Sequence, residues 1–293
     1  RLYQPAYTPV VLVCCVFVLV TLFACAYGTR DQIPLLKQHE KHTQRVSLIS
    51  LFGDIVSVMT NRNYRALLFG LFFLAITAGT HETLSLYVQT FIWDLNAYQL
   101  GFLIWGNIVG THLAFFVTPS LHQRFDRRWA IFWSCLIFAI FWSMPTNLKL
   151  LGIGPDVATW DAVLFIGCLK VISVCAGVVL TISVMAGLAD IADEHELLTG
   201  QRQEGIFYSA RTFFSKAMNA FGHIVAGFAI DFYIKLPPKS VPGEVAEDIV
   251  FRLGIIDGPF AMVWGIIGAF VYLGYRIDRQ RYQEIRAQLD GRE

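Results

Sequence analysis

Long apolar stretches separated by short polar and charged segments dominate the pattern of the chain. A helix needs about 20 apolar residues to cross the roughly 30 Å hydrocarbon layer of a membrane. Seven stretches approach or exceed this length, and they cover residues 10–28, 66–92, 98–118, 129–147, 160–188, 205–233 and 257–275. The pattern therefore predicts an all-α, polytopic membrane protein with seven transmembrane helices.

The composition narrows the class of function. Of the 293 residues, 55% are hydrophobic and 15% are charged, whereas a typical soluble domain has about 25% charged residues. This excludes an ordinary soluble enzyme. The net charge of +1 favours no nucleic-acid partner, so we expect membrane lipids as partners.

No enzyme or metal motif stands out. The six cysteines all lie in apolar stretches and lack metal-ligand spacing, so no metal site is predicted. His81-Glu82 lacks the second histidine of a zinc-protease motif, and neither a phosphate-binding loop nor a nucleophile elbow occurs. We therefore expect a protein that is not an enzyme.

The distribution of Lys and Arg predicts the orientation in the membrane. Of 23 such residues, 15 lie in segments 29–65, 119–128 and 189–204 and in the tail, all on one side. Cytoplasmic segments carry this excess, so the C-terminus is expected in the cytoplasm. Between Val46 and Met59 apolar positions recur at helical spacing, which fits either a helix lying on the membrane surface or a solvated linker helix.

Several spans carry polar side chains that lipid does not solvate. One face of span 205–233 holds four of them, Thr212, Lys216, Asn219 and His223. Lys216, Lys170 and Glu82 all lie near mid-membrane at 1.5 Å rise per residue. An ionisable group at that depth needs a partner or a water-filled cavity. We expect Glu82 to pair with Lys216 or Lys170 across a central cavity; a purely structural ion pair is the alternative.

Other polar and aromatic positions are more ambiguous. Trp105 shares a helical face with His112, and an indole beside hydrogen-bonding groups suits a sugar ring, although core packing is the alternative. For His81 and His112 hydrogen-bonded packing is favoured over ligand binding. Aspartates at span ends or in loops are expected to be solvated: Asp54, Asp126, Asp156, Asp161 and Asp257.

The most distinctive motif follows the fifth span. It reads Ala-Asp-x-x-Asp over 189–193, Thr-Gly-x-Arg-x-Glu-Gly over 199–205 and Phe-Tyr-Ser over 207–209. This resembles the loop and eleventh helix of the glycoside-pentoside-hexuronide:cation symporters, a branch of the major facilitator superfamily. The segments 61–65, 94–101 and 124–128 are similar to the same family.

The resemblance covers essentially the whole chain and implies helices six to twelve of a twelve-helix fold. Residues 1–28 would be the last helix of the N-terminal bundle, and 29–65 the central cytoplasmic loop. Residues 66–276 would form the six-helix C-terminal bundle and 277–293 a cytoplasmic tail. The small residues Gly222, Ala226 and Gly227 are expected to let helices approach closely.

The motif also suggests a cytoplasmic gate. Arg202 is expected to pair with Asp190 or Asp193, with Gly200 and Gly205 allowing the chain to turn. Three further charged residues are assigned to this gate: Glu204, Arg124 and Arg128.

The function that the resemblance implies is symport of a sugar or glycoside with Na⁺ or H⁺ by alternating access, in a bacterial inner membrane. Lys216 matches the family's helix-eleven lysine near the sugar and cation sites. No cofactor is expected beyond the coupling cation, whose ligands in this family lie mainly in the N-terminal half. A lipid or amphiphile carrier of the same fold and a truncated, non-transporting scaffold are the alternatives.

Overall fold

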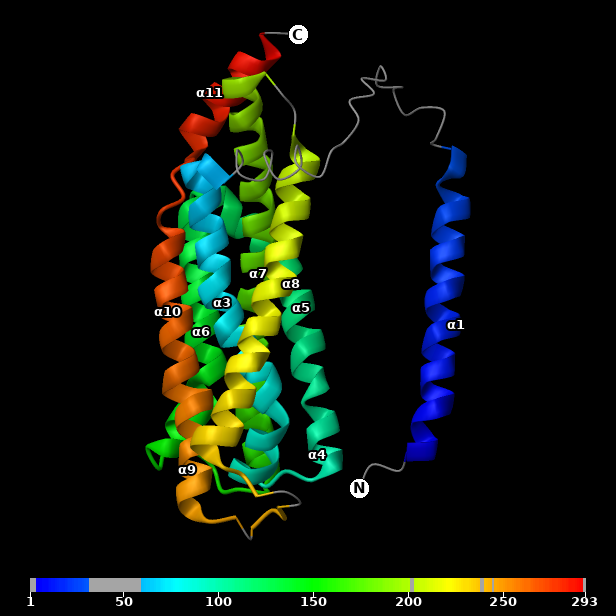
Figure 1. Ribbon diagram of the computed structural model, residues 1–293, viewed down its shortest axis with the longest axis vertical. Helices are drawn as coiled ribbons and strands as arrows, with labels where there is room; N and C mark the ends of the chain where they lie inside the picture. Colours follow the sequence, from blue (N-terminus) through cyan, green and yellow to red (C-terminus); the bar gives the residue numbers. More distant parts are fainter. Residues whose placement is uncertain (1–3, 32–58, 201–202, 238–239, 244, 292–293) are drawn as a thin grey trace. The chain divides into compact units, whose positions relative to one another are not determined.

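A computed structural model describes residues 4–31, 59–200, 203–237, 240–243 and 245–291 (Figure 1). The chain divides into two units, Arg1–Ser47 and Leu48–Glu293. The described residues form helices and connecting turns without a β-strand, and seven helices are long and apolar enough to cross a membrane. The predicted all-α fold with seven spans is confirmed.

The first unit contains one long helix, α1, which runs over Gln4–Gly28. Its side chains from Val11 onward are almost all apolar, as a helix that faces lipid requires. The hydroxyl of Thr21 donates to the carbonyl oxygen of Phe17 at 2.9 Å, so this polar group is satisfied within the helix.

The second unit is a bundle of six spans that lie side by side (Figure 1). Three of the spans include a turn of π-helix, labelled η. In chain order the elements are α3 (Arg62–Tyr87), η2 (Val88–Ile92), α4 (Ala97–Phe102), α5 (Ile104–Arg124), α6 (Arg127–Leu150), α7 (Trp160–Thr199), α8 (Glu204–Phe228), η3 (Ala229–Ile234), α9 (Glu247–Ile255), η4 (Ile256–Phe260), α10 (Ala261–Tyr272) and α11 (Arg279–Asp290).

Helix α3 packs against both α8 and α10. Helix α6 packs against α7 and α10, and α5 packs against α7. Near one end, the ring of Tyr64 meets that of Phe207 edge-on at 5.0 Å, and its hydroxyl donates to the Phe207 carbonyl oxygen at 3.1 Å. Near the other end, Trp93 is fully buried in a second apolar cluster.

Some predicted boundaries are wrong. Helix α7 continues to Thr199 instead of ending at 188, so the acidic residues of the gate motif lie on a helix and not in a loop. Gly200 ends α7 in the left-handed conformation (φ 70°), as expected of a turn, whereas Gly205 lies inside the first turn of α8. The tail contains helix α11. The surface helix expected between Val46 and Met59 lies almost wholly outside the described residues.

Glycine brings α3 and α8 into close contact. A Cβ atom on Gly222 would lie 2.4 Å from the carbonyl oxygen of Ala75, and one on Gly79 would lie 2.8 Å from the backbone of Gly222. Only glycine fits at such a contact between backbones. Ala226 is fully buried, but a Cβ on Gly227 would meet nothing within 4 Å. The small-residue prediction is therefore right for Gly222 and wrong for Gly227.

Substitution of Gly222 by Ala should force α3 and α8 apart, because the clashing atom belongs to the backbone and has no freedom to turn away. We expect a loss of about 1–3 kcal/mol in the free energy of unfolding, measured by thermal unfolding in detergent micelles. Gly227→Ala, on the same helix, is the matched control and should leave stability unchanged or slightly higher. Equal effects of the two substitutions would contradict this account of the contact.

Candidate functional site

A cavity of about 390 Å³ lies within the bundle, a size typical of small-molecule sites. Helices α3, α5, α6 and α7 and the π-turns η2 and η4 supply most of its walls. Its charged or ionisable lining residues are His81, Glu82, Lys170 and Asp257, and its uncharged polar ones are Ser85, Gln89, Asn107, Thr146 and Ser173. The rest of the lining is mainly apolar and includes the rings of Trp93 and Trp142.

Helical spacing explains how the polar groups reach one cavity. Glu82, Ser85 and Gln89 recur every three or four residues on α3 and η2, and the Gln89 amide donates to the Ser85 hydroxyl at 3.1 Å. Lys170 enters from α7. Gly106 of α5 faces the aliphatic part of the Lys170 side chain, and a Cβ atom on this glycine would lie 3.5 Å from the Cβ of Lys170. This glycine therefore leaves room for the lysine.

Glu82 and Lys170 lie at the same depth. Each is ten residues from the same end of the bundle, which places both about 15 Å along their helices at 1.5 Å per residue. Among the described residues, however, the ion-pair partner of Glu82 is His223, with Oε2 and Nε2 3.6 Å apart. The expected ion pair with Lys216 or Lys170 is therefore not found.

The close contact of α3 and α8 explains this partner. Gly79 and Gly222 touch. Glu82 and Thr83, about one turn further along α3, therefore meet His223, the residue that follows Gly222 on α8. The other ring nitrogen of His223, Nδ1, lies 2.8 Å from the hydroxyl oxygen of Thr83. Both His223 and Glu82 keep nearly half of their side-chain surface exposed.

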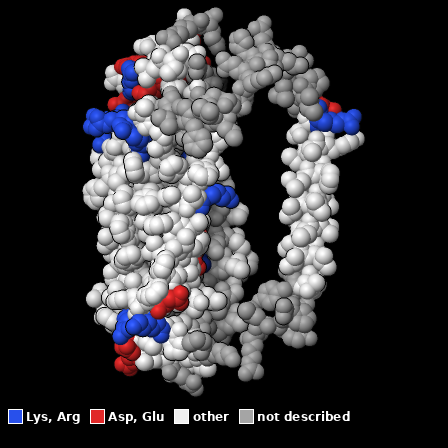
Figure 2. Space-filling view, in the orientation of Figure 1, with Lys and Arg blue, Asp and Glu red and all other residues white. Residues whose placement is uncertain are grey.

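The polar face of α8 does not line the cavity. Thr212, Lys216 and His223 are exposed on this helix, and the side-chain oxygen of Asn219 is buried without a hydrogen-bond partner in the described part of the chain. Figure 2 shows that charged side chains of the bundle gather mainly toward its two ends. An exposed lysine in the middle of a span therefore needs contact with water or with another part of a protein, because lipid does not solvate it.

Trp105 also lies outside the cavity. Its side chain is exposed on α5, next to Leu164 and Cys168 of α7. Asn107, two residues later, points to the cavity instead because successive helical positions differ by about 100°. The sugar-stacking role predicted for Trp105 thus has no support from its position.

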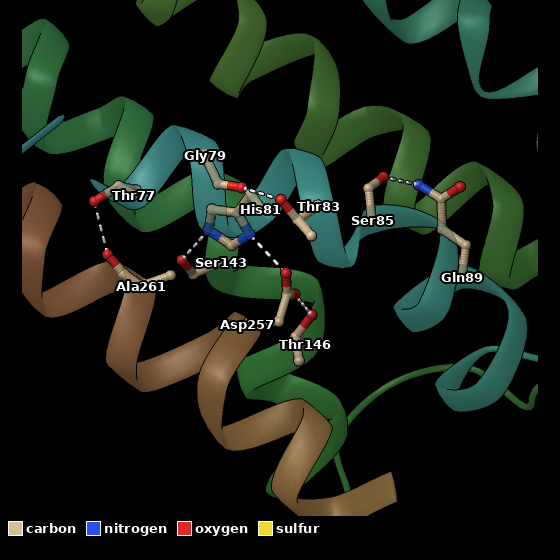
Figure 3. Close-up of polar contacts among 10 residues, drawn as sticks. All are labelled: Thr77, Gly79, His81, Thr83, Ser85, Gln89, Ser143, Thr146, Asp257 and Ala261. Carbon is tan, nitrogen blue, oxygen red and sulfur yellow. Dashed lines mark hydrogen bonds and ion pairs between the residues drawn. The ribbon is translucent and has the colours of Figure 1, made fainter. Parts of the chain in front are cut away.

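Sequence reasoning missed a deeply buried carboxylate in the cavity lining, that of Asp257 (Figure 3). Asp257 was expected to be solvated at a span end, yet its side chain is 5% exposed. Its Oδ1 lies 2.8 Å from Nδ1 of His81, and its Oδ2 accepts from Thr146 at 2.6 Å. The Nε2 of His81 lies 2.8 Å from the Ser143 hydroxyl oxygen, and its ring stacks on Trp142. This agrees with the hydrogen-bonded packing favoured for His81.

The error has a physical cause. Asp248 and Arg252 interrupt the apolar pattern, so the last span was expected to begin at Asp257. These two residues instead pair with each other at 3.0 Å, one turn apart on α9, and the span begins at Glu247. Asp257 is therefore ten residues inside the helix, on the π-turn η4.

Comparison with known proteins assigns the family. A sequence model of the MFS/sugar transport protein family matches residues 2–279. The chain belongs to this family. It is 23% identical to the glucuronide carrier protein homolog of Escherichia coli K12 over 280 residues, which covers 94% of this chain and 55% of that protein. It is also 24% identical over 134 residues to an uncharacterized symporter of Synechocystis, which covers 44% of this chain and 24% of that protein.

Two conclusions follow from these matches. The chain spans about half the length of the glucuronide carrier relative. The resemblance to the glycoside-pentoside-hexuronide branch of the major facilitator superfamily is confirmed, and the family consists of transporters and not of enzymes.

In this MFS/sugar transport chain, the acidic motif of α7 forms a charged cluster near the end of the bundle that carries α11. Asp190 pairs with Arg127 of α6 and accepts from the hydroxyl of Tyr275 at 2.8 Å. Burial raises the pKa of Tyr275, so its hydroxyl keeps the proton that it donates. Asp193 lies 3.6 Å from Arg286 of α11. Both aspartates therefore have arginine partners on other helices.

In the described structure, the other residues assigned to the gate do not pair with Asp190. Arg202, the expected partner of these aspartates, lies outside the described residues. Arg124 is exposed, Arg128 places its guanidinium 5.6 Å from the ring centre of Trp129, and Glu204 begins α8. Sequence reasoning missed Glu194, whose Oε2 accepts from Asn61 at 3.3 Å and from Asn63 at 2.9 Å and so ties α7 to the start of α3.

Removal of the Asp190 carboxylate should destabilise this end of the bundle. Asp190→Ala removes the acceptor of the Tyr275 hydroxyl. It leaves Arg127 with only the Ala186 carbonyl oxygen among the described residues, so we expect a loss of about 1–3 kcal/mol. Thermal unfolding in micelles, followed by tryptophan fluorescence, measures this loss. Asp248→Ala breaks an exposed ion pair on α9 instead and should cost less than about 0.5 kcal/mol. An Asp190 variant as stable as this control would show that the cluster contributes nothing to the fold.

Proposed function

We propose that the native protein is a secondary active transporter that carries a sugar or glycoside together with Na⁺ or H⁺ by alternating access. The observation that carries this proposal is the cavity, in which Glu82 and Lys170 meet amide and hydroxyl groups about halfway through the membrane spans. The family supports transport, and the two relatives, a carrier homologue and a symporter by name, support coupled transport of a glycoside.

The chemistry of the lining suits a sugar. A sugar ring presents hydroxyls that both donate and accept, and Gln89, Asn107 and Ser173 offer both kinds of group. Lys170 adds a charged donor and Glu82 a charged acceptor. The apolar C–H face of a ring needs an aromatic surface, which Trp93 and Trp142 provide.

The exposed polar face of α8 supports alternating access. Lys216 and His223 interrupt a membrane-spanning helix on a side that lies open in this bundle. We propose that a second bundle faces them across a water-filled path, and that the two bundles rock around the site. No cofactor is proposed beyond the coupling cation; if this cation is Na⁺, we assign its ligands mainly to the N-terminal half of the transporter.

The orientation follows from the positive-inside rule. Among the described residues of the bundle, the segments at the α11 end carry more Lys and Arg residues than those at the other end. We therefore propose that α11 and the charged cluster around Asp190 are cytoplasmic. The cluster would then act at the cytoplasmic gate of a transporter in the bacterial inner membrane.

The direct test is exchange of labelled glycosides across proteoliposomes that contain the native protein. Methyl β-galactoside, phenyl β-glucuronide and free glucuronate serve as probes, with Na⁺ or pH gradients applied in separate runs. We expect saturable exchange of at least one probe and faster uptake down one of the cation gradients. Transfer of a fluorescent lysolipid without exchange of any glycoside would instead favour the amphiphile carrier.

Lys170→Met should lower the rate of glycoside exchange by at least about tenfold, because a charge-assisted hydrogen bond contributes about 1.5–3 kcal/mol to binding. Glu82→Gln should reduce exchange for the same reason. The matched control is Lys235→Met, which removes the same charge from an exposed position directly after η3, outside the cavity lining. Full exchange activity in the Lys170 variant would remove this residue from the proposed site.

A further inference from the structure

The pair formed by His81 and Asp257 is buried deeply enough to need a functional explanation. Their side chains are 2% and 5% exposed, and Asp257 lies about 15 Å along its span from the end at Glu247. Burial of ionisable groups at such depth costs desolvation free energy. Apolar residues would therefore pack at these positions with less loss of stability. Both residues also line the cavity.

We propose that His81 and Asp257 form a proton-binding site that couples transport to a proton gradient. This inference rests on the proposed function and names the coupling ion and its site within this bundle. Three features of the site carry the argument: its hydrogen bonds, its access to the cavity, and the charges around it.

The hydrogen bonds remain satisfied whether or not the ring carries the extra proton. In both states Nδ1–H donates to Asp257. The neutral ring accepts at Nε2 from the Ser143 hydroxyl, and the charged ring donates to the same oxygen over the same 2.8 Å. A proton is therefore taken up and released without breaking the cluster.

The cavity gives the proton a route. Its volume of about 390 Å³ accommodates several water molecules, each of which occupies about 30 Å³ in the liquid. His81 and Asp257 both line this space. The Thr146 hydroxyl, which also lines the cavity, already donates to the second carboxylate oxygen. The proposed path of the proton to the pair therefore leads through this cavity.

The surrounding charges link proton binding to closure of the cavity. In the described structure, the other charged groups that face the cavity are Glu82 of α3 and Lys170 of α7, while α5 and α6 contribute groups that do not ionise. The net charge of these four groups, His81, Asp257, Glu82 and Lys170, is zero when His81 is protonated and −1 when it is neutral. His223 of α8 contacts Glu82 from outside the cavity.

Further charges on the neighbouring helices are held by other groups. Lys149 of α6 lies over the Trp93 ring at 5.3 Å, and Asp248 and Arg252 of α9 pair with each other. A cavity that closes and loses its water favours the neutral, protonated form. Proton binding and closure therefore stabilise each other.

The π-turn η4 positions the carboxylate. A π-turn widens the helix by one residue, and such turns are frequent at functional sites. Here it carries Asp257 on its second residue and Pro259 on its fourth. Asp257 thus reaches His81 on α3 and Thr146 on α6 at once, which ties three spans to one ionisable pair.

The test compares proton-driven accumulation with exchange in proteoliposomes, using whichever glycoside probe exchanges fastest. At one proton per glycoside, a gradient of one pH unit supports about tenfold accumulation. We expect His81→Gln and Asp257→Asn to abolish this accumulation and so lower its ratio to exchange about tenfold. Thr77→Val is the matched control, because it removes a buried hydrogen bond from α3 to Ala261, one turn from His81.

A second readout needs no substrate. Infrared difference spectra of the purified protein with isotope-labelled histidine, taken between about pH 5 and 8, should contain a histidine band that His81→Gln removes. Asp257→Asn should shift this band. If the His81 variant does not fold, the Asp257 variant replaces it in this test. Absence of the band from the wild-type spectrum, or equal loss of accumulation in Thr77→Val, would overturn the proton site.

The two readouts separate this inference from the proposed function. Exchange of a glycoside driven by Na⁺ alone, with no histidine band, would leave the transporter intact and reject the proton site. A histidine band without exchange of any glycoside would reject the proposed function but retain the site.

Discussion

The absence of water from the hydrocarbon layer is the constraint on which the structure of the bundle depends. Each polar side chain in a span needs a partner within the protein or a place beside a cavity. Simple hydroxyls meet this need locally, as when Thr21 and Thr181 donate to carbonyl oxygens of their own helices. Charged groups cannot, and they gather instead around the cavity, at the helix ends and on the open face of α8.

The same constraint explains what the sequence allowed us to predict. The seven spans follow from the lengths of the apolar stretches, because few other structures tolerate them. The presence of Glu82 and Lys170 in one cavity follows from their matching depths and from the cost of leaving either in lipid. Each of these predictions requires only the sequence of a single helix and the depth of a residue along it.

Predictions about which helices touch were weaker, because they depend on packing that no single helix reveals. Glu82 pairs with His223 because Gly79 and Gly222 touch, and two glycines far apart in the chain carry no sign that they meet. Asp257 was misplaced because the pair Asp248–Arg252 looks like a span boundary in the sequence. Asp190 pairs with Arg127 because α7 extends further than its apolar stretch.

Helix α3 gains a particular importance from these contacts. His81 and Glu82 are consecutive, so they point to different sides of the helix. His81 contacts Asp257 of η4 and Ser143 of α6, whereas Glu82 contacts His223 of α8. Both also line the cavity with Lys170. A shift or rotation of α3 would therefore alter the buried pair, the ion pair with α8 and the cavity wall together. In a rocking transporter, this single helix would link proton binding on one side to the interface between bundles on the other.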